Sequence, residues 1–274
     1  MNIAPDAARI LQLTDTHLFA DPSHALLKLN TQDSFERVLA LIAAREKDIQ
    51  LIVATGDISQ DASPEAYTRF CEAMKVFAVP FLWLPGNHDS RVVMDEIRAR
   101  LQRRSGAAAL PLAATVGNWR IITLDSAVPG EVHGYLADAE LVLLEKELAG
   151  TAAAGQHAMV CLHHNPVPGS AGWMSGIGLR NEDAFLSVID RHRCVGAVVY
   201  GHIHQELDFE RNGVRYFCTP STCIQFKPNV ADFTLDELNP AYRWYNLRGN
   251  GAIDSGVVRL TNFVAEVDLG STGY

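Results

Sequence analysis

The chain has 274 residues, of which 48% are hydrophobic, and carries a formal net charge of -9. This length and apolar content are enough for one large α/β domain, so we predict a single domain over residues 1–274. The acidic balance argues against a general basic surface for nucleic acid or anionic membranes, and any phosphate that binds would need local positive charge.

The chain's cysteines are odd in number and lack CxxC spacing; they are Cys71, Cys161, Cys194, Cys218 and Cys223. Three of them lie in apolar, strand-like runs, so we expect reduced and mostly buried thiols. The first residues lack the pattern of a secretory signal, and no apolar run approaches the roughly 18 residues that span a bilayer. We therefore expect a cytoplasmic protein without a membrane partner.

Short β-branched apolar runs alternate with helix-like stretches along the first 200 residues. Strands are predicted at residues 10–13, 49–54, 81–84, 119–124, 157–162 and 195–200. Helices are predicted at residues 32–47, 65–77, 91–104, 138–148 and 182–191. Asp33 or Thr31 can cap the first helix, and Ser63-Pro64 supplies the cap and first turn of the second. The alternation predicts an α/β fold.

The pattern changes after Gly201 to shorter β-like runs, at residues 206–210, 214–218, 242–247 and 257–260. Arg211-Asn212-Gly213 is typical of a hairpin turn, so residues from about 205 to 274 are predicted to be mostly antiparallel β-structure. Ala107-Ala108-Ala109 and Ala152-Ala153-Ala154 have the composition of loose surface connections.

Five of the predicted strands end in clusters of Asp, Asn and His. The clusters are Asp15-Thr16-His17, Gly56-Asp57, Gly86-Asn87-His88-Asp89, His163-His164-Asn165-Pro166 and Gly201-His202-Ile203-His204. One such cluster alone is more often a turn or a helix cap. Functional groups of an open α/β sheet gather beyond the carboxyl ends of its strands, however, and five clusters in succession predict one shared site.

Burying these side chains together is costly unless a cation is present, because carboxylates lose hydration and repel one another. Oxygen and imidazole donors without thiolate suit ions such as manganese, iron, zinc or cobalt. In extended chain, Asp15 and His17 would point the same way. Of His163 and His164, we expect only one to be a ligand.

An alternative for His202 and His204 is an ordinary strand with two imidazoles on its solvent face. Gly201 argues against it, because a glycine at this position permits tight backbone packing at the end of the strand.

In order and approximate spacing, these motifs resemble the signature of the calcineurin-like metallophosphoesterases. Leu13 to Phe19, Gly201 to Asp208 and Pro220 to Cys223 further resemble the bacterial class III cyclic AMP phosphodiesterases, and this similarity spans nearly the whole chain. The resemblance implies a four-layer α-β-β-α sandwich with mixed sheets and a metal site at the edge of those sheets.

The resemblance also implies two sets of metal ligands that share Asp57 as a bridge. One set is Asp15, His17, Asp57 and His204, and the other is Asp57, Asn87, His163 and His202. Iron and manganese are the expected ions, with zinc and cobalt as alternatives. Besides Asp57, the expected catalytic residue is His88, which faces the substrate phosphate in the family and can donate a proton.

Substrate contacts are expected from His17, Asn87, His88 and His204. Two residues depart from the protein phosphatases of the family: Gln60 stands where they have Asp, and Asp89 where they have Glu. These departures put a His-Asp dyad and a protein substrate in doubt.

The expected reaction is hydrolysis of 3′,5′-cyclic AMP to 5′-AMP by a hydroxide that bridges two metals. The same motifs would serve another small phosphodiester, such as a glycerophosphodiester or a 2′,3′-cyclic nucleotide. A non-catalytic scaffold is a further alternative, against which the complete ligand set argues. Candidates for contact with the nucleoside are Trp173, Arg180, Asn181 and the segment Ser221-Thr222-Cys223. The oligomeric state is open, with a dimer among the options.

Overall fold

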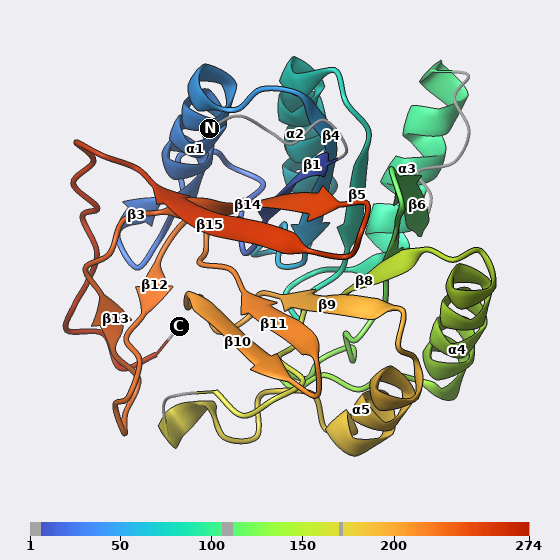
Figure 1. Ribbon diagram of the computed structural model, residues 1–274. Coiled ribbons are helices and arrows are strands. Elements are labelled where there is room, and N and C mark those ends of the chain that lie inside the picture. The colour runs from blue at the N-terminus through green and yellow to red at the C-terminus, as the bar shows by residue number, and fades with distance from the viewer. Residues whose placement is uncertain (1–6, 106–111, 170–171, 274) are drawn as a thin grey trace.

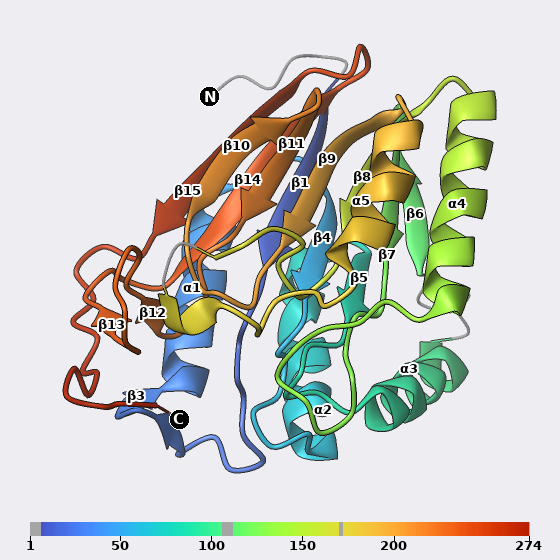
Figure 2. The same cartoon turned by 90° about the horizontal axis from the view of Figure 1, so that it is seen from below.

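The computed structural model describes residues 7–105, 112–169 and 172–273, and has two β-sheets lying face to face between layers of helices (Figures 1 and 2). The first sheet has the order β15-β14-β1-β4-β5, with bounds Ile253–Arg259, Ala241–Arg248, Ala7–Leu13, Ile49–Thr55 and Phe81–Leu84. The second has the order β10-β11-β9-β8-β7-β6, with bounds Leu207–Arg211, Val214–Cys218, Val195–Tyr200, His157–Cys161, Trp119–Thr123 and Ala113–Val116.

Helices cover the outer face of each sheet. Those on the first sheet are α1 (Thr31–Arg45), α2 (Pro64–Met74), the short η1 (Lys75–Phe77) and α3 (Arg91–Ser105). Those on the second are α4 (Asp138–Ala153) and α5 (Glu182–Arg191). The predicted α/β fold with α-β-β-α layers and mixed sheets is therefore confirmed. No helix within the described ranges has the length and apolar character needed to cross a membrane.

Three apolar layers separate these four layers of secondary structure. Ile10 and Val53 pack between the two sheets, whereas Leu11 and Ile52, their neighbours in sequence, pack against α1 and α2. Both faces of β1 and β4 are thus buried, which explains why their sequences are mostly apolar rather than alternating. The second sheet packs on α4 and α5 in the same way.

The C-terminal strands join both sheets. β14 pairs antiparallel with β1, and β15 pairs with β14 at the edge of the first sheet. β10 and β11 form the predicted hairpin, in which Asn212 and Gly213 have φ of 52° and 81°, as a type I′ turn requires. β11 pairs parallel with β9, however, so this region is not antiparallel throughout. Two short hairpins complete the strands: β2 (Ala25–Leu26) with β3 (Leu29–Asn30), and β12 (Gln225–Phe226) with β13 (Leu235–Asp236).

Some local predictions were wrong. The N-cap of α1 is Asn30, whose side chain accepts from the Asp33 amide, rather than Thr31 or Asp33. Ala152 and Ala153 belong to the last turn of α4, because a run of alanines has high helix propensity and simply extends the helix. β15 begins at Ile253, earlier than expected, and β6 was not predicted. Ala107-Ala108-Ala109 lies outside the described residues.

One buried cation ties the two sheets together. The Arg243 side chain of β14 is only 2% exposed and crosses to the second sheet. Its Nη2 donates to the carbonyls of Cys218 (2.9 Å) and Leu207 (3.1 Å), and its Nε donates to Thr219 Oγ1 (3.2 Å). The guanidinium also lies 5.2 Å from the centre of the Phe217 ring.

We expect Arg243→Leu to lower the free energy of unfolding by about 2–4 kcal/mol, because the buried Cys218 carbonyl and the partly buried Leu207 carbonyl would lose this donor. Arg248→Leu in the same strand is the matched control, since that guanidinium pairs with Asp254 at the surface and should contribute about 1 kcal/mol or less. Urea denaturation of both variants measures the difference, and equal losses would contradict the role given to Arg243.

Candidate metal centre

The polar clusters lie where the structure brings the carboxyl ends of five strands together. Asp15 and His17 follow β1, and Asp57 follows β4. The loop after β5 contains Asn87 and His88, and the segments after β8 and β9 contain His163 and then His202 and His204. Because the two sheets face each other, loops from both reach the same point.

Asp57 lies at the centre of this cluster. Its Oδ2 is 3.3 Å from His163 Nε2 and 3.7 Å from His17 Nε2. The remaining short distances are His17 Nε2 to His204 Nε2, His204 Nε2 to Asp15 Oδ1, and His163 Nε2 to Asn87 Oδ1, each 3.3 Å. The His202 ring centre is 5.0 Å from that of His163. All seven residues predicted as ligands therefore lie in one cluster.

Each of the four imidazoles is oriented by an oxygen that binds one of its ring nitrogens. The pairs are His17 Nδ1 with Gln60 Oε1 (2.5 Å), His163 Nδ1 with the Thr55 carbonyl (2.8 Å), His204 Nδ1 with the Ile224 carbonyl (2.9 Å), and His202 Nε2 with the Ile177 carbonyl (3.0 Å). Metal-binding histidines are held in the same way, because the outer bond fixes the tautomer and the ring orientation. The donor set thus fits metal ions.

The backbone of the cluster is not extended, contrary to the expectation for Asp15 and His17. Positive φ is found at Asp15 (54°), His17 (46°), Asp57 (49°), His202 (67°) and His204 (46°). Such conformations cost free energy for residues with a Cβ, and they persist where the surrounding structure over-determines them, typically at functional sites. The strain is what turns side chains of successive loops toward one point.

Two glycines make the close approach possible. At Gly201, an added Cβ would lie 2.1 Å from Thr14 Oγ1 and 2.6 Å from Asp15 Oδ2. At Gly56, with φ of +97°, it would lie 2.4 Å from His163 Nδ1. Any side chain at these positions would push a ligand out of the cluster. The tight packing predicted for Gly201 is confirmed.

The charges of the cluster balance one another. Burial opposes the ionisation of Asp15 and Asp57, but His204 lowers the pKa of Asp15 and His163 lowers that of Asp57. Burial also acts on His163, where the Asp57 carboxylate outweighs it and raises the pKa to about 9. His17 is different, because burial dominates and lowers its pKa to about 3. The ionised carboxylates and the neutral His17 are in the forms that a metal cation needs, and His163 would release its proton to bind one.

His88 and Asn87 lie at the partly exposed side of the cluster. The His88 amide donates to Asp57 Oδ1 (2.9 Å), and its ring centre is 5.0 Å from that of His17. This imidazole is therefore close to the central carboxylate and within reach of a ligand that approaches from solvent.

Asp89 has a structural role that the sequence did not predict. The sequence showed only that it stands where the family's protein phosphatases have Glu. Its carboxylate accepts from the amides of Ile58, Ser59 and Gly86 and from the Tyr67 hydroxyl. Burial, helped by Asp57, raises its pKa to about 7. Asp89 thus joins the loops after β4 and β5, which contain Asp57 and Asn87.

His164 lies behind the cluster rather than at the surface. Its Nδ1 is 2.8 Å from Ser126 Oγ, and its ring contacts the His163 and His202 rings at centre distances of 4.9 Å and 4.7 Å. The Cys223 thiol is a second neighbour; its segment was expected near the nucleoside, but the motifs did not predict a thiol beside the metal ligands. Its Sγ and one ring nitrogen each of His17 and His204 lie within 4.8 Å of one another.

The residues expected near the nucleoside have different surroundings. Asn181 exchanges two hydrogen bonds with the backbone of Leu136, at 3.0 Å and 2.8 Å, so its amide is already used in holding a loop. Trp173 packs against Phe226 and Phe233. Arg180 is exposed and lines a cavity of about 260 Å³, which also includes both neighbours of Ile177, the residue whose carbonyl orients His202.

A two-sheet sandwich with a buried Asp, Asn and His cluster at the strand ends is the arrangement of a metal-dependent phosphoesterase. Residues 8–206, more than half of the chain, match the calcineurin-like phosphoesterase family, and the chain belongs to that family.

Curated relatives match over nearly their full length. The 3′,5′-cyclic adenosine monophosphate phosphodiesterase CpdA of Pseudomonas aeruginosa is 42% identical, over 99% of this chain and 97% of its own. The protein of the same name from Escherichia coli K12 is 41% identical, over 97% of this chain and 94% of its own. A solved dimetal phosphatase from Danio rerio has a TM-score of 0.62 and 17% identity, over 93% of this chain and 99% of its own, and supports the fold alone.

We expect Gly201→Ala to lower the free energy of unfolding by about 1–3 kcal/mol and to weaken metal binding, because the methyl group would displace Asp15. Gly150→Ala in α4 is the control: nothing lies within 4 Å of its added Cβ, and alanine should stabilise a helix by about 0.5–1 kcal/mol. Chemical denaturation with metal analysis tests the pair, and a Gly201→Ala variant as stable as the wild type would refute the crowding argument.

Proposed function

We propose that this protein hydrolyses 3′,5′-cyclic AMP to 5′-AMP at a centre of two metal ions. The observation that carries the proposal is the position of Asp57, whose carboxylate lies between His17 and His163 inside a cluster of buried ligands. The names of the curated relatives from Pseudomonas aeruginosa and Escherichia coli support the choice of substrate.

The proposed ligands follow the two sides of Asp57. One ion would be held by Asp15, His17, Asp57 and His204, and the other by Asp57, Asn87, His163 and His202. Iron or manganese is proposed for these positions, while zinc and cobalt suit the same donors. When bound, such a pair of ions acidifies a water molecule and neutralises phosphodiester charge, which compensates for the acidic character of the chain.

The chain's own residues would orient the phosphodiester and supply a proton. Hydrolysis breaks the bond between phosphorus and O3′, adds water across it, and leaves the phosphate on O5′. The departing O3′ needs a proton, and the half-buried His88 imidazole, beside His17 and Asp57, would give it and stabilise charge on the phosphate oxygens. His17, Asn87 and His204 are proposed as the other contacts of the phosphate.

We further propose that the nucleoside extends toward the cavity beside Arg180, since this cavity adjoins the segment that orients His202. The protein would act in the cytoplasm as a single domain on a small-molecule substrate, without a nucleic-acid or membrane partner. The alternative substrate is another small phosphodiester, which the same cluster would accept.

Two substitutions separate the metal ligands from the proton donor. Asp57→Asn should lose bound metal and turnover together, because the neutral amide lacks the charge and the second donor oxygen with which the carboxylate would serve both ions. His88→Ala should keep both metal ions and lower kcat by about 10²–10⁴-fold, the range for loss of a general acid. Metal content by plasma mass spectrometry, measured beside cyclic AMP hydrolysis, decides between the roles, and a metal-free His88→Ala protein would invalidate the assignment of His88.

A substrate panel tests the specificity. One preparation of defined metal content is assayed with cyclic AMP, cyclic GMP, a 2′,3′-cyclic nucleotide and a generic aryl phosphodiester. The highest kcat/KM is expected for cyclic AMP. A strong preference for either of the last two substrates would overturn the cyclic AMP assignment without affecting the fold.

A further inference from the structure

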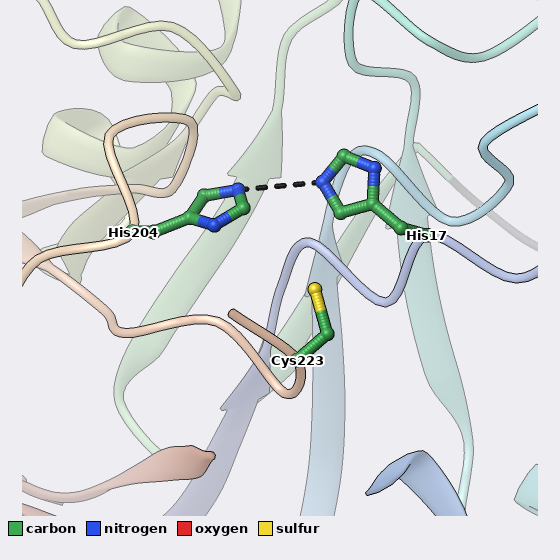
Figure 3. A group of neighbouring side chains, drawn as sticks. All are labelled: His17, His204 and Cys223. Carbon is green, nitrogen blue, oxygen red and sulfur yellow. Dashed lines mark hydrogen bonds between the residues drawn. The ribbon is translucent and has the colours of Figure 1, made fainter. Parts of the chain in front are cut away.

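A buried thiol faces the metal cluster. Figure 3 shows the imidazoles of His17 and His204 directed at each other, with the sulfur of Cys223 directed toward the space between them. The two Nε2 atoms are 3.3 Å apart, and Cys223 is 1% exposed and forms no disulfide. Within the described ranges, Cys223 is the only cysteine that belongs to a group of neighbouring ligand side chains.

The thiol is held in this position by the same segment that holds the ligands. Its backbone amide donates to Ser221 Oγ (2.8 Å), and Ser221 Oγ in turn donates to the Asp15 carbonyl (2.7 Å). The carbonyl of the next residue, Ile224, accepts a hydrogen bond from His204 Nδ1 (2.9 Å). Asp15, Cys223 and His204 are therefore fixed relative to one another by short hydrogen bonds.

The other buried cysteines have surroundings of a different kind. Cys71 belongs to α2 and packs in the core between the helices and the first sheet, and Cys161 packs between the two sheets. Thiols of that type behave as small apolar groups. Cys223 instead combines a soft donor atom with two imidazoles at ligand spacing, and zinc and cobalt readily accept such a mixture of sulfur and nitrogen.

We propose that Cys223 Sγ is a further ligand of the metal position between His17 and His204. This inference rests on the proposed function for the existence of that position. The thiol releases its proton as the bond to the metal forms, so the ligand is a thiolate. A thiolate favours thiophilic ions, and Cys223 would make this position prefer zinc or cobalt to manganese, while the position on the His163 side keeps oxygen and nitrogen donors alone.

X-ray absorption at the zinc edge of the zinc-loaded, full-length protein tests the inference directly. The wild type should show a sulfur neighbour at about 2.3 Å, amounting to one sulfur for two zinc ions. Cys223→Ser should lose this neighbour and keep the fold. Cys194→Ser is the control, because Cys194 lies at the amino end of β9, away from the cluster, and should leave the sulfur signal unchanged.

Metal selectivity gives a second measurement. Loss of a hydrogen-bond partner outside the ligands lowers metal affinity by roughly 10–100-fold, and loss of a ligand should cost at least as much. The ratio of zinc affinity to manganese affinity should therefore fall by at least this factor in Cys223→Ser. The cobalt-loaded wild type should also show a thiolate-to-cobalt charge-transfer band that the variant lacks.

The outcomes separate this inference from the proposed function. Two bound zinc ions and cyclic AMP turnover without a sulfur neighbour would overturn the role of Cys223 and leave the phosphodiesterase standing. A wild type that binds no metal would overturn both. A sulfur neighbour that persists in Cys223→Ser would show that another thiol is the ligand.

Discussion

The structure depends on keeping two buried carboxylates ionised in one small volume. Asp15 and Asp57 are almost fully buried, where isolated charges would be strongly disfavoured. They remain charged because His163 and His204, which follow strands of the second sheet, approach within 3.3 Å and because backbone amides, such as that of His202, point at the carboxylate oxygens. The arrangement gathers two ionised carboxylates and several imidazoles in one place, and a bound metal ion would neutralise the carboxylate charge.

The sandwich architecture is what makes this arrangement possible. Neither sheet alone contains the full cluster, since Asp15, Asp57 and Asn87 follow strands of the first sheet. The candidate ligands that follow strands of the second are His163, His202 and His204. Arg243 keeps the sheets in register on the side of β14. Within the first sheet, Asp89 holds the loops after β4 and β5 together, because its carboxylate accepts hydrogen bonds from both. The rigidity of the scaffold is therefore part of the site.

Much of this could be predicted from the sequence, because strand periodicity and polar clusters at strand ends are local signals. The motifs predicted seven candidate ligands at one site, and the structure brings these residues together. The features that the sequence did not predict depend on contacts between distant parts of the chain. The positive φ of Asp15 arises from contacts with distant loops, the hydrogen bonds of Asp89 join separate segments, and Cys223 reaches His17 only through the fold. The parallel pairing of β11 with β9 is of the same kind, since hairpin signals describe only neighbouring strands.

The pairing of β1 with β14 has a consequence for how the enzyme matures. Arg9 and Asn246, which are hydrogen bonded, are separated by 237 positions in the chain. The loop that contains Asp15 is completed by the segment around Ser221 and backed by β14, so both must be synthesised before that loop can close. The loop that contains Asp15 can therefore reach its final structure only after the chain has been synthesised beyond β14, so the site forms late in folding.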